Sequence, residues 1–265
     1  MFDKFGRRIH YLRISVTDRC NLRCVYCMPE EGVPLIRHED VLSFEEIVGV
    51  TRAAVAMGVD KVRLTGGEPL VRRDIVALVS MLDKIEGIAD LAMTTNGTLL
   101  DAFAAPLAIA GLQRVNVSLD ALDPKRYAVL TRGGDVQRVL DGLAAARAAG
   151  LEPIKLNCVV RASSREPDAQ AVATFAHENG FAVQFIRRMN LSKGEFSSVE
   201  GGAGGDCPRC NRLRLSSNGF IRPCLFSDLE FSVRELGPEE AIRRAVEYKP
   251  ESGRTSQNRF HAIGG

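Results

Sequence analysis

The chain has 265 residues, of which 45% are hydrophobic and 26% are charged, and its formal net charge is +2. This length suits one large barrel or two small domains, with a core that needs no disulfide staples. The small net charge gives no general case for nucleic-acid binding, and no apolar run approaches the length of a membrane span. Residues 1–8 lack the apolar core of a secretory signal, so we expect a cytoplasmic protein.

Hydrophobic periodicity predicts strands that alternate with helices as far as residue 188. A capping box of Ser43 and Glu46 opens a helix that runs to about Met57. The predicted strands cover residues 10–17, 61–65, 89–95, 113–119, 153–160 and 181–188. Further helices are predicted over residues 73–85, 99–110, 135–149 and 167–179, and after Pro124. Six such strands indicate a parallel sheet of βαβ units but are too few for a complete eight-stranded barrel.

The alternation stops after Met189. Residues 190–206 contain the run Gly201-Gly202-Ala203-Gly204-Gly205, which has no apolar period and is typical of a flexible connector. Beyond it we predict a hairpin over residues 212–224 and a helix over residues 238–247. The sequence therefore suggests three parts: a barrel unit over 1–189, the connector over 190–206, and a C-terminal region over 207–265.

Six of the seven cysteines fall in two groups of three, which favours metal or redox chemistry over disulfides. Cys20, Cys24 and Cys27 are spaced C-x3-C-x2-C, which does not fit the four ligands of a zinc site. Three thiolates would ligate three irons of a four-iron cluster and leave the fourth iron open to another ligand.

The second group consists of Cys207, Cys210 and Cys224. It could be three quarters of a zinc ribbon, but no fourth cysteine or nearby histidine completes one, and a second open four-iron cluster fits the count better. Arg212 and Arg214 are two residues apart, so in a strand they share one face and can point at the same ligand.

Other polar residues follow predicted strands. The turn Gly66-Gly67-Glu68-Pro69 could be only a tight turn, or its glycines could let backbone approach a ligand. Four further residues, Arg13, Arg63, Thr94 and Lys155, lie in or at the ends of four different strands. Each alone could be a solvated side chain, but together they could form a phosphate pocket at the carboxyl ends of the strands.

The run from Leu12 to Cys20, together with Cys24, Tyr26, Cys27 and Met28, resembles the radical S-adenosylmethionine (radical SAM) enzymes. The pattern C-x2-C-x-R-x-R over residues 207–214 is similar to that of the GTP 3′,8-cyclases within this superfamily. This resemblance implies a partial (β/α)6 TIM-like barrel, with a C-terminal extension that carries a second Fe–S cluster. It also implies two [4Fe-4S] clusters and SAM as cofactors.

By the same resemblance, the protein converts GTP to 3′,8-cyclo-7,8-dihydro-GTP in the first step of molybdopterin biosynthesis. The implied cluster ligands are Cys20, Cys24, Cys27, Cys207, Cys210 and Cys224. The implied SAM-binding residues are Tyr26, Gly66, Gly67, Glu68, Ser118 and Met189. The implied GTP-binding residues are Arg13, Arg63, Thr94, Lys155, Arg212 and Arg214. The implied catalytic residues are Cys20, Cys24, Cys27, Arg212 and Arg214. The terminal Gly264-Gly265 resembles the double-glycine tail of the family.

The implied partners are a reductant protein such as flavodoxin or ferredoxin, the next enzyme of the pathway and a second copy in a homodimer, with no nucleic acid and no membrane. The sequence departs from the family in its short segment at 190–206 and in the run Arg187-Arg188-Met189-Asn190. Two other functions therefore stay open: a radical SAM enzyme that acts on a peptide or another nucleotide, and a non-enzymatic Fe–S redox sensor. The first is disfavoured because a peptide needs no phosphate pocket such as Arg13, Arg63, Lys155, Arg212 and Arg214 could form. The second is disfavoured because a sensor has no need for SAM, which the Gly66-Gly67-Glu68-Pro69 turn would bind.

Overall fold

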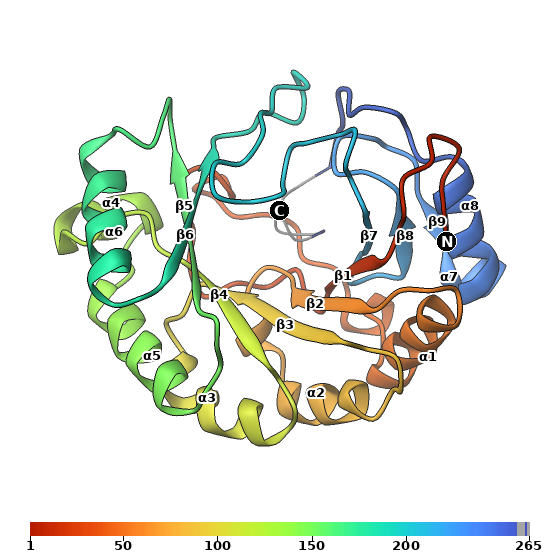
Figure 1. Ribbon diagram of the computed structural model, residues 1–265, viewed down its shortest axis with the longest axis horizontal. Helices are drawn as coiled ribbons and strands as arrows, with labels where there is room; N and C mark the ends of the chain where they lie inside the picture. The colour runs from red at the N-terminus through yellow and green to blue at the C-terminus, as the bar shows by residue number, and fades with distance from the viewer. Residues whose placement is uncertain (259–262, 264–265) are drawn as a thin grey trace.

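The computed structural model describes residues 1–258 and residue 263, and the Gly264-Gly265 tail lies outside this range. One nine-stranded sheet runs through the described chain in the order β6-β5-β4-β3-β2-β1-β7-β8-β9. It curves around an interior, with helices on its outer side (Figure 1). The fold is therefore mixed α/β with a largely parallel sheet, as predicted.

The first six strands are parallel neighbours in chain order. They are β1 (Tyr11–Ser15), β2 (Lys61–Thr65), β3 (Asp90–Thr95), β4 (Arg114–Ser118), β5 (Lys155–Val160) and β6 (Ala182–Arg187). The intervening helices are α1 (Phe44–Ala56), α2 (Ile75–Asp83), α3 (Leu100–Ile109), α4 (Pro124–Thr131), α5 (Val136–Ala148) and α6 (Pro167–Glu178). Short 3-10 turns, η1 (His38–Asp40) and η2 (Pro69–Val71), precede α1 and α2. All six predicted strands and the helices between them are confirmed.

The C-terminal region continues the same sheet. Strand β7 (Arg212–Leu215) pairs in parallel with β1, and β8 (Phe220–Arg222) turns back on it as the predicted hairpin. The two-residue β9 (Phe231–Ser232) and the four-residue α7 (Val233–Leu236) are too short to show a sequence period, and they were not predicted. Helix α8 (Pro238–Glu247) has its predicted bounds.

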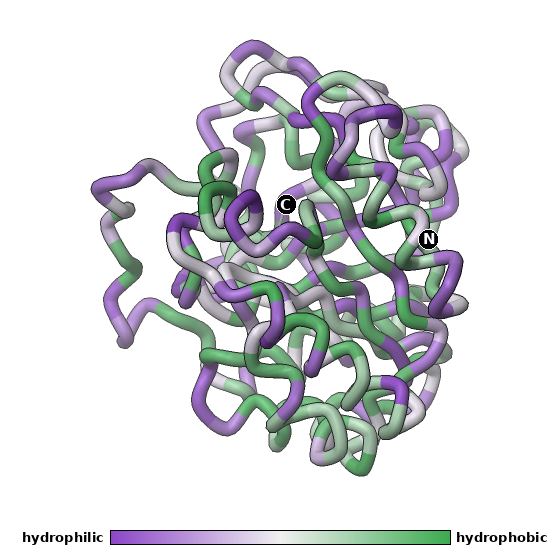
Figure 2. Tube along the Cα trace, turned by 90° about the vertical axis from the view of Figure 1, so that its left-hand side faces the viewer, coloured by the Kyte–Doolittle hydropathy of each residue, from purple (hydrophilic) through white to green (hydrophobic). Residues whose placement is uncertain are grey.

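The two faces of the sheet differ in chemistry, and β1 illustrates the difference. Leu12 and Ile14 are fully buried in the main hydrophobic core, whereas Tyr11 and Arg13 line an interior cavity. Strands covered on both faces usually read as continuous apolar runs. Here hydrophobic and polar residues still alternate along the strand, because the inner face of the sheet lines a polar cavity. Figure 2 shows hydrophobic and hydrophilic segments following one another along the trace.

The segment 190–206 crosses from the edge strand β6 toward β7 (Figure 1). It forms isolated bridges between Asn190 and Glu195 and between Phe185 and Glu200. Leu191 belongs to a second small core with Leu225, Phe226 and Ile263. This short segment thus closes part of the gap between the two ends of the curved sheet. Across residues 1–258 and 263, no helix is long and apolar enough to cross a membrane.

Two helical glycines allow a test of the outer layer. A Cβ built at Gly142 in α5 would lie 2.5 Å from the Gly97 carbonyl oxygen, while one at Gly49 in α1 would meet nothing within 4 Å. We expect Gly142→Ala to lower the free energy of unfolding by about 1–3 kcal/mol through overpacking. Gly49→Ala should raise it by up to about 1 kcal/mol, because alanine costs less backbone entropy in a helix. Urea unfolding measures the change in both variants. If both substitutions change the free energy of unfolding in the same direction, that result would contradict this packing.

Candidate active site

The loop with Cys20, Cys24 and Cys27 leaves the carboxyl end of β1 and is held by three neighbouring elements. The Tyr26 hydroxyl donates to Asp120 Oδ2 at 2.6 Å, and Asp120 Oδ1 accepts from the Val159 N–H at 2.8 Å, so the loop is tied to β4 and β5. Arg132, just after α4, donates to the carbonyl oxygens of Arg23 and Met28, both at 2.8 Å. The loop is therefore positioned from several strand ends.

The turn after β2 lies directly against the chain that leads to Cys20. The Gly67 N–H donates to the Thr17 carbonyl and the Glu68 N–H to the Arg19 carbonyl, each at 2.8 Å. A Cβ at Gly66 would lie 2.5 Å from Thr17 O, and one at Gly67 would lie 2.3 Å from Arg19 O. These two positions accept only glycine because backbone meets backbone there.

Glu68 joins this turn to the end of β3. Its carboxylate is 1% exposed and accepts hydrogen bonds from Thr95 Oγ1 at 2.7 Å, Asn96 N at 2.7 Å and Leu70 N at 3.0 Å. A carboxylate offers about four acceptor positions, so one remains for an ammonium group of a ligand. Burial raises the pKa of Glu68 to about 7, although these hydrogen bonds oppose the rise.

The first three thiols suit a four-iron cluster. All seven cysteines are free, and Cys20 Sγ accepts from Leu22 N at 3.4 Å and from Asn96 Nδ2 at 3.8 Å. Hydrogen bonds to sulfur are one of the features that tune such clusters. Within the described residues, no three His, Cys, Asp or Glu side chains are arranged to hold a single metal ion. A four-iron cluster differs in that each thiolate ligates its own iron.

Strand register gathers the basic residues on the inner face of the sheet. Arg13 on β1 lies opposite Arg63 on β2 and opposite Arg214 on β7. One row closer to the amino ends, Tyr11 lies between Lys61 and Arg212. Like charges on adjacent strands repel one another, so these rows favour a bound anion.

These residues line a cavity of about 290 Å³. It brings together every residue predicted to bind GTP: Arg13, Arg63, Thr94, Lys155, Arg212 and Arg214. It is also lined by Cys207, Cys210 and Cys224, and by Met189. The second cysteine group and the basic residues therefore face the same space.

The electrostatics of this cavity reflect burial and repulsion. Burial first, and then the Arg63 and Arg212 charges, lower the pKa of Arg13 to about 10. Burial and the neighbouring arginines lower the pKa of Arg214 to about 9. The Asn116 side-chain oxygen, on a residue that is 4% exposed, has no hydrogen-bond partner among the described atoms. A bound anion would offset the repulsion between the arginines, and a donor group on the same ligand would give the Asn116 oxygen a hydrogen-bond partner.

Tyr11 sits at the centre of the basic residues. Lys61, Arg212 and Arg63 lie over its ring at 5.5, 5.7 and 5.9 Å from the centroid. Burial would raise the pKa of its hydroxyl, but the charges of Arg13 and the three overlying cations lower it. The aromatic ring thus holds apart cations that would otherwise repel one another at close range.

Two buried cations position the second cysteine group. Arg7 donates to the carbonyl oxygens of Cys207 at 2.8 Å, Pro250 at 2.7 Å and Glu251 at 2.9 Å, and its Nε pairs with Asp3 at 2.6 Å. Lys249 Nζ donates to the Arg212 carbonyl at 2.8 Å and the Pro223 carbonyl at 2.5 Å. Together they join the chain termini to the segments that carry the three thiols.

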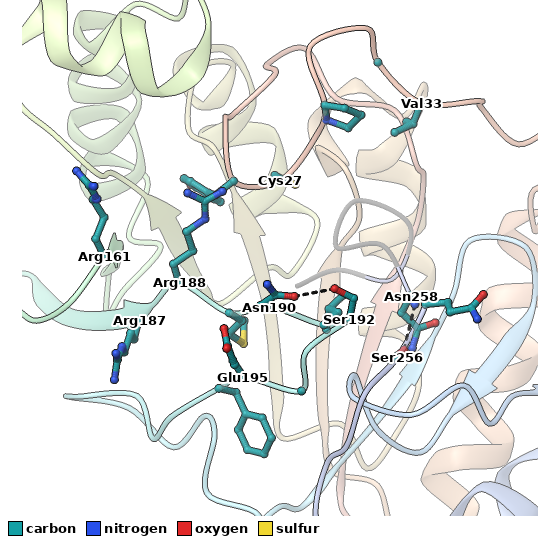
Figure 3. A pocket seen from close by; sticks show the side chains of 18 of the residues that line it. Cys27, Val33, Arg161, Arg187, Arg188, Asn190, Ser192, Glu195, Ser256 and Asn258 are labelled. Atoms are coloured by element: carbon teal, nitrogen blue, oxygen red, sulfur yellow. Dashed lines mark hydrogen bonds between the residues drawn. The ribbon is translucent and has the colours of Figure 1, made fainter.

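A second, larger pocket of about 1280 Å³ opens beside the first cysteine loop. Tyr26, Cys27 and Met189 line it, and Met189 also lines the basic cavity. Figure 3 shows Arg161 and Arg187 on one side of this pocket and Ser256 on the opposite side. Met189 therefore lies where the two spaces meet, next to both cysteine groups.

The remaining predicted residues line neither space. They are Cys20, Cys24, Gly66, Gly67, Glu68 and Ser118. All except Ser118 belong to the loop and turn described above, and Ser118 closes β4 opposite Asn157. Their contacts with SAM therefore stay predictions.

Sequence reasoning missed five residues of the site. Tyr11 and Lys61 could have been found, because each lies two positions before a predicted site residue and so shares its face. Asp120 follows a predicted strand as a carboxylate, which is also a usable signal. Arg7 and Lys249 gave no signal in the sequence, since their roles depend on tertiary contacts.

A curved parallel sheet with three thiols beyond its first strand agrees with the comparisons with known proteins. The pattern of the Radical SAM superfamily matches residues 14–163. The fold resembles that of SuiB from Streptococcus suis in a crystal structure bound to S-adenosylmethionine, with a TM-score of 0.57 and 21% identity. The match covers 70% of this chain and only 42% of SuiB, so it supports the fold alone.

Two curated relatives carry the assignment further. A GTP 3′,8-cyclase from Geobacter sulfurreducens is 41% identical, over 95% of this chain and 93% of its own. Another, from Moorella thermoacetica, is 40% identical over the full length of both chains. This chain belongs to the radical SAM superfamily and, within it, to the GTP 3′,8-cyclase family. The Moorella alignment spans 323 residues, so that relative has segments which this 265-residue chain lacks.

The pKa of Glu68 gives a test of the buried turn in the iron-free, reduced protein. The carboxyl group takes up a proton more readily in the folded chain, so its contribution to stability falls as pH rises from about 4.5 to about 7. This shift corresponds to about 3 kcal/mol. We expect Glu68→Gln to remove this pH dependence from the free energy of unfolding, measured with urea between pH 4 and pH 8. Glu86→Gln, at an exposed position, controls for the loss of a carboxylate, and an unchanged slope in Glu68→Gln would contradict the assignment.

Proposed function

We propose that this chain is a radical SAM GTP 3′,8-cyclase, which converts GTP to 3′,8-cyclo-7,8-dihydro-GTP in the first step of molybdopterin biosynthesis. The observation that carries the proposal is the 290 Å³ cavity, in which seven cationic side chains and three thiols face one space. The cations are Arg13, Lys61, Arg63, Arg114, Lys155, Arg212 and Arg214. A triphosphate has enough charge to engage such a set, whereas a peptide needs no phosphate pocket.

The cofactors are two [4Fe-4S] clusters and SAM. Cys20, Cys24 and Cys27 would hold the first cluster, and Cys207, Cys210 and Cys224 the second. When bound, the first cluster would supply the electron for cleavage of SAM, and the cleaved SAM would remove the hydrogen atom from C3′ of GTP. A bond between C3′ and C8 of guanine would then form, and one electron from the second cluster with one proton would complete 3′,8-cyclo-7,8-dihydro-GTP.

The protein's own groups bind and orient the reactants. Glu68 would offer its remaining acceptor position to the SAM ammonium group, and the Gly66-Gly67 turn and the Tyr26 backbone would shape the SAM site with Ser118. Met189 would pack on the adenine of SAM. Arg13, Arg63, Thr94 and Lys155 hold the phosphates. Arg212 and Arg214 orient the nucleotide toward the second cluster.

The short connector contributes to this site. Ala203, Gly204 and Gly205 line the basic cavity, and the Ala203 carbonyl accepts from Arg212 Nη2 at 2.7 Å. This wall supports a functional cyclase in spite of the reduced length. We assign residues 1–189 to SAM cleavage, 190–206 to the connector and 207–265 to the second cluster.

The proposal extends to a cytoplasmic location, a homodimer, a reductant protein such as flavodoxin or ferredoxin, and transfer of the product to the next enzyme of the pathway.

The test is an anaerobic incubation of the reconstituted protein with SAM, dithionite and GTP. We expect about eight irons per chain, two clusters of four, with 5′-deoxyadenosine and a cyclised nucleotide that both depend on GTP. Deoxyadenosine without a nucleotide product would redirect the search to other substrates. Intact clusters without deoxyadenosine would support the redox sensor or an inactive enzyme instead.

A substitution tests the phosphate pocket directly. Burial, with Arg114, Arg63 and Lys61 nearby, lowers the pKa of Lys155, which lines the cavity. Because a hydrogen bond to a charged group contributes about 1.5–3 kcal/mol, Lys155→Met should raise the KM for GTP by about 10- to 100-fold. Lys125→Met, at an exposed position on α4, is the matched control. Equal KM values for the two variants would remove Lys155 from the GTP site.

A further inference from the structure

Lys249 is a buried cation beside the second cysteine group. It follows α8, is 1% exposed, and donates from Nζ to the carbonyl oxygens of Arg212 and Pro223. Arg212 begins β7 two residues after Cys210, and Pro223 directly precedes Cys224. The ammonium therefore lies between the segments that present Cys210 and Cys224.

The charge of Lys249 lacks a carboxylate partner in the part of the chain that the structure describes. Arg7, the neighbouring buried cation, is paired with Asp3 at 2.6 Å. Removing an ammonium from water costs several kcal/mol unless an opposite charge compensates it. Two carbonyl dipoles satisfy the N–H groups but carry no net charge. The anions closest at hand are therefore the sulfurs of the second cysteine group.

Two arginines add to the positive charge beside those sulfurs. Arg212 and Arg214 line the same cavity as Cys207, Cys210 and Cys224. The pocket is thus electropositive where the proposed cluster would sit.

The first cysteine group has the opposite surroundings. Asp120 accepts a hydrogen bond from Tyr26 within this cysteine loop, and Glu68 lies in the turn packed against it. Both carboxyl groups are buried, Glu68 at 1% and Asp120 at 6% exposure. The buried charged groups beside the two sets of thiols are therefore of opposite kind, carboxyl groups at the first and cations at the second.

We propose that Lys249 is the fixed counter-charge of the second cluster and raises its reduction potential. Reduction adds one electron from an external donor to the cluster, with no bond or proton change, and makes the cluster and its thiolates more negative. A buried positive charge stabilises that state over the oxidised one. This inference rests on the proposed second cluster.

The experiment isolates the second cluster in the full chain. Cys20, Cys24 and Cys27 are replaced by alanine, the protein is reconstituted, and the midpoint potential is measured by EPR during redox titration. Lys249→Met removes the charge and the donors, whereas Lys249→Gln removes the charge and keeps an N–H donor. The matched control is Lys84→Met, at an exposed lysine after α2.

Both neutral variants should lower the equilibrium constant for reduction by about tenfold, which is a shift of about 59 mV toward negative potential for one electron. Lys84→Met should leave it unchanged. If Lys249 only anchors the chain, Lys249→Met would lose iron while the potential of the remaining cluster stayed the same, and the inference would be overturned.

Two further outcomes are informative. If neither neutral variant retains iron, Lys249→Arg decides: iron retained with arginine supports the counter-charge, and iron lost with arginine as well overturns it. The proposed function itself fails if no second cluster forms, either in the unmodified chain or in the variant that has alanine at Cys20, Cys24 and Cys27. That result is distinct from an unchanged potential in the Lys249 variants.

Discussion

The parallel register between β1 and its two neighbours is the constraint on which the rest of this molecule depends. It places Arg13 between Arg63 and Arg214 on one face of the sheet, while Leu12 and Ile14 enter the core on the other. A shift of one residue would send the guanidinium groups into the core and the leucine into the cavity. Fold stability and anion binding are therefore two results of a single alignment of strands.

The two cysteine groups show different ways to hold a reactive loop. The first is fixed by backbone contacts with the Gly66-Gly67 turn and by buried carboxyl groups that accept hydrogen bonds from several strand ends. The second is fixed by the buried cations Arg7 and Lys249, which bind carbonyl oxygens from distant segments. Acidic and basic surroundings thus belong to the scaffolds themselves, before any ligand is bound.

Local sequence patterns predicted most of the fold. The bounds of β2 and α8 and the six-strand order follow from periodicity, capping and glycine positions. The pairing of β7 with β1 could not be predicted, since it joins strands about 200 residues apart and leaves no local period. For the site, the strand residues and the second cysteine group that the sequence singled out line one cavity. Their roles as phosphate-binding residues and cluster ligands stay predictions. Lys249 reads in the sequence as an ordinary surface lysine, because only the folded chain buries it.

The contacts of Arg7 have a consequence for biosynthesis on the ribosome. Its partners Cys207, Pro250 and Glu251 are made 200 or more residues later, whereas the partners of the first cysteine loop, as far as Val159, are made much earlier. At about 5–20 residues per second, several seconds separate these two events. The site of the first three thiols can therefore assemble on the growing chain well before the site of the other three, which must wait until Glu251 has been made.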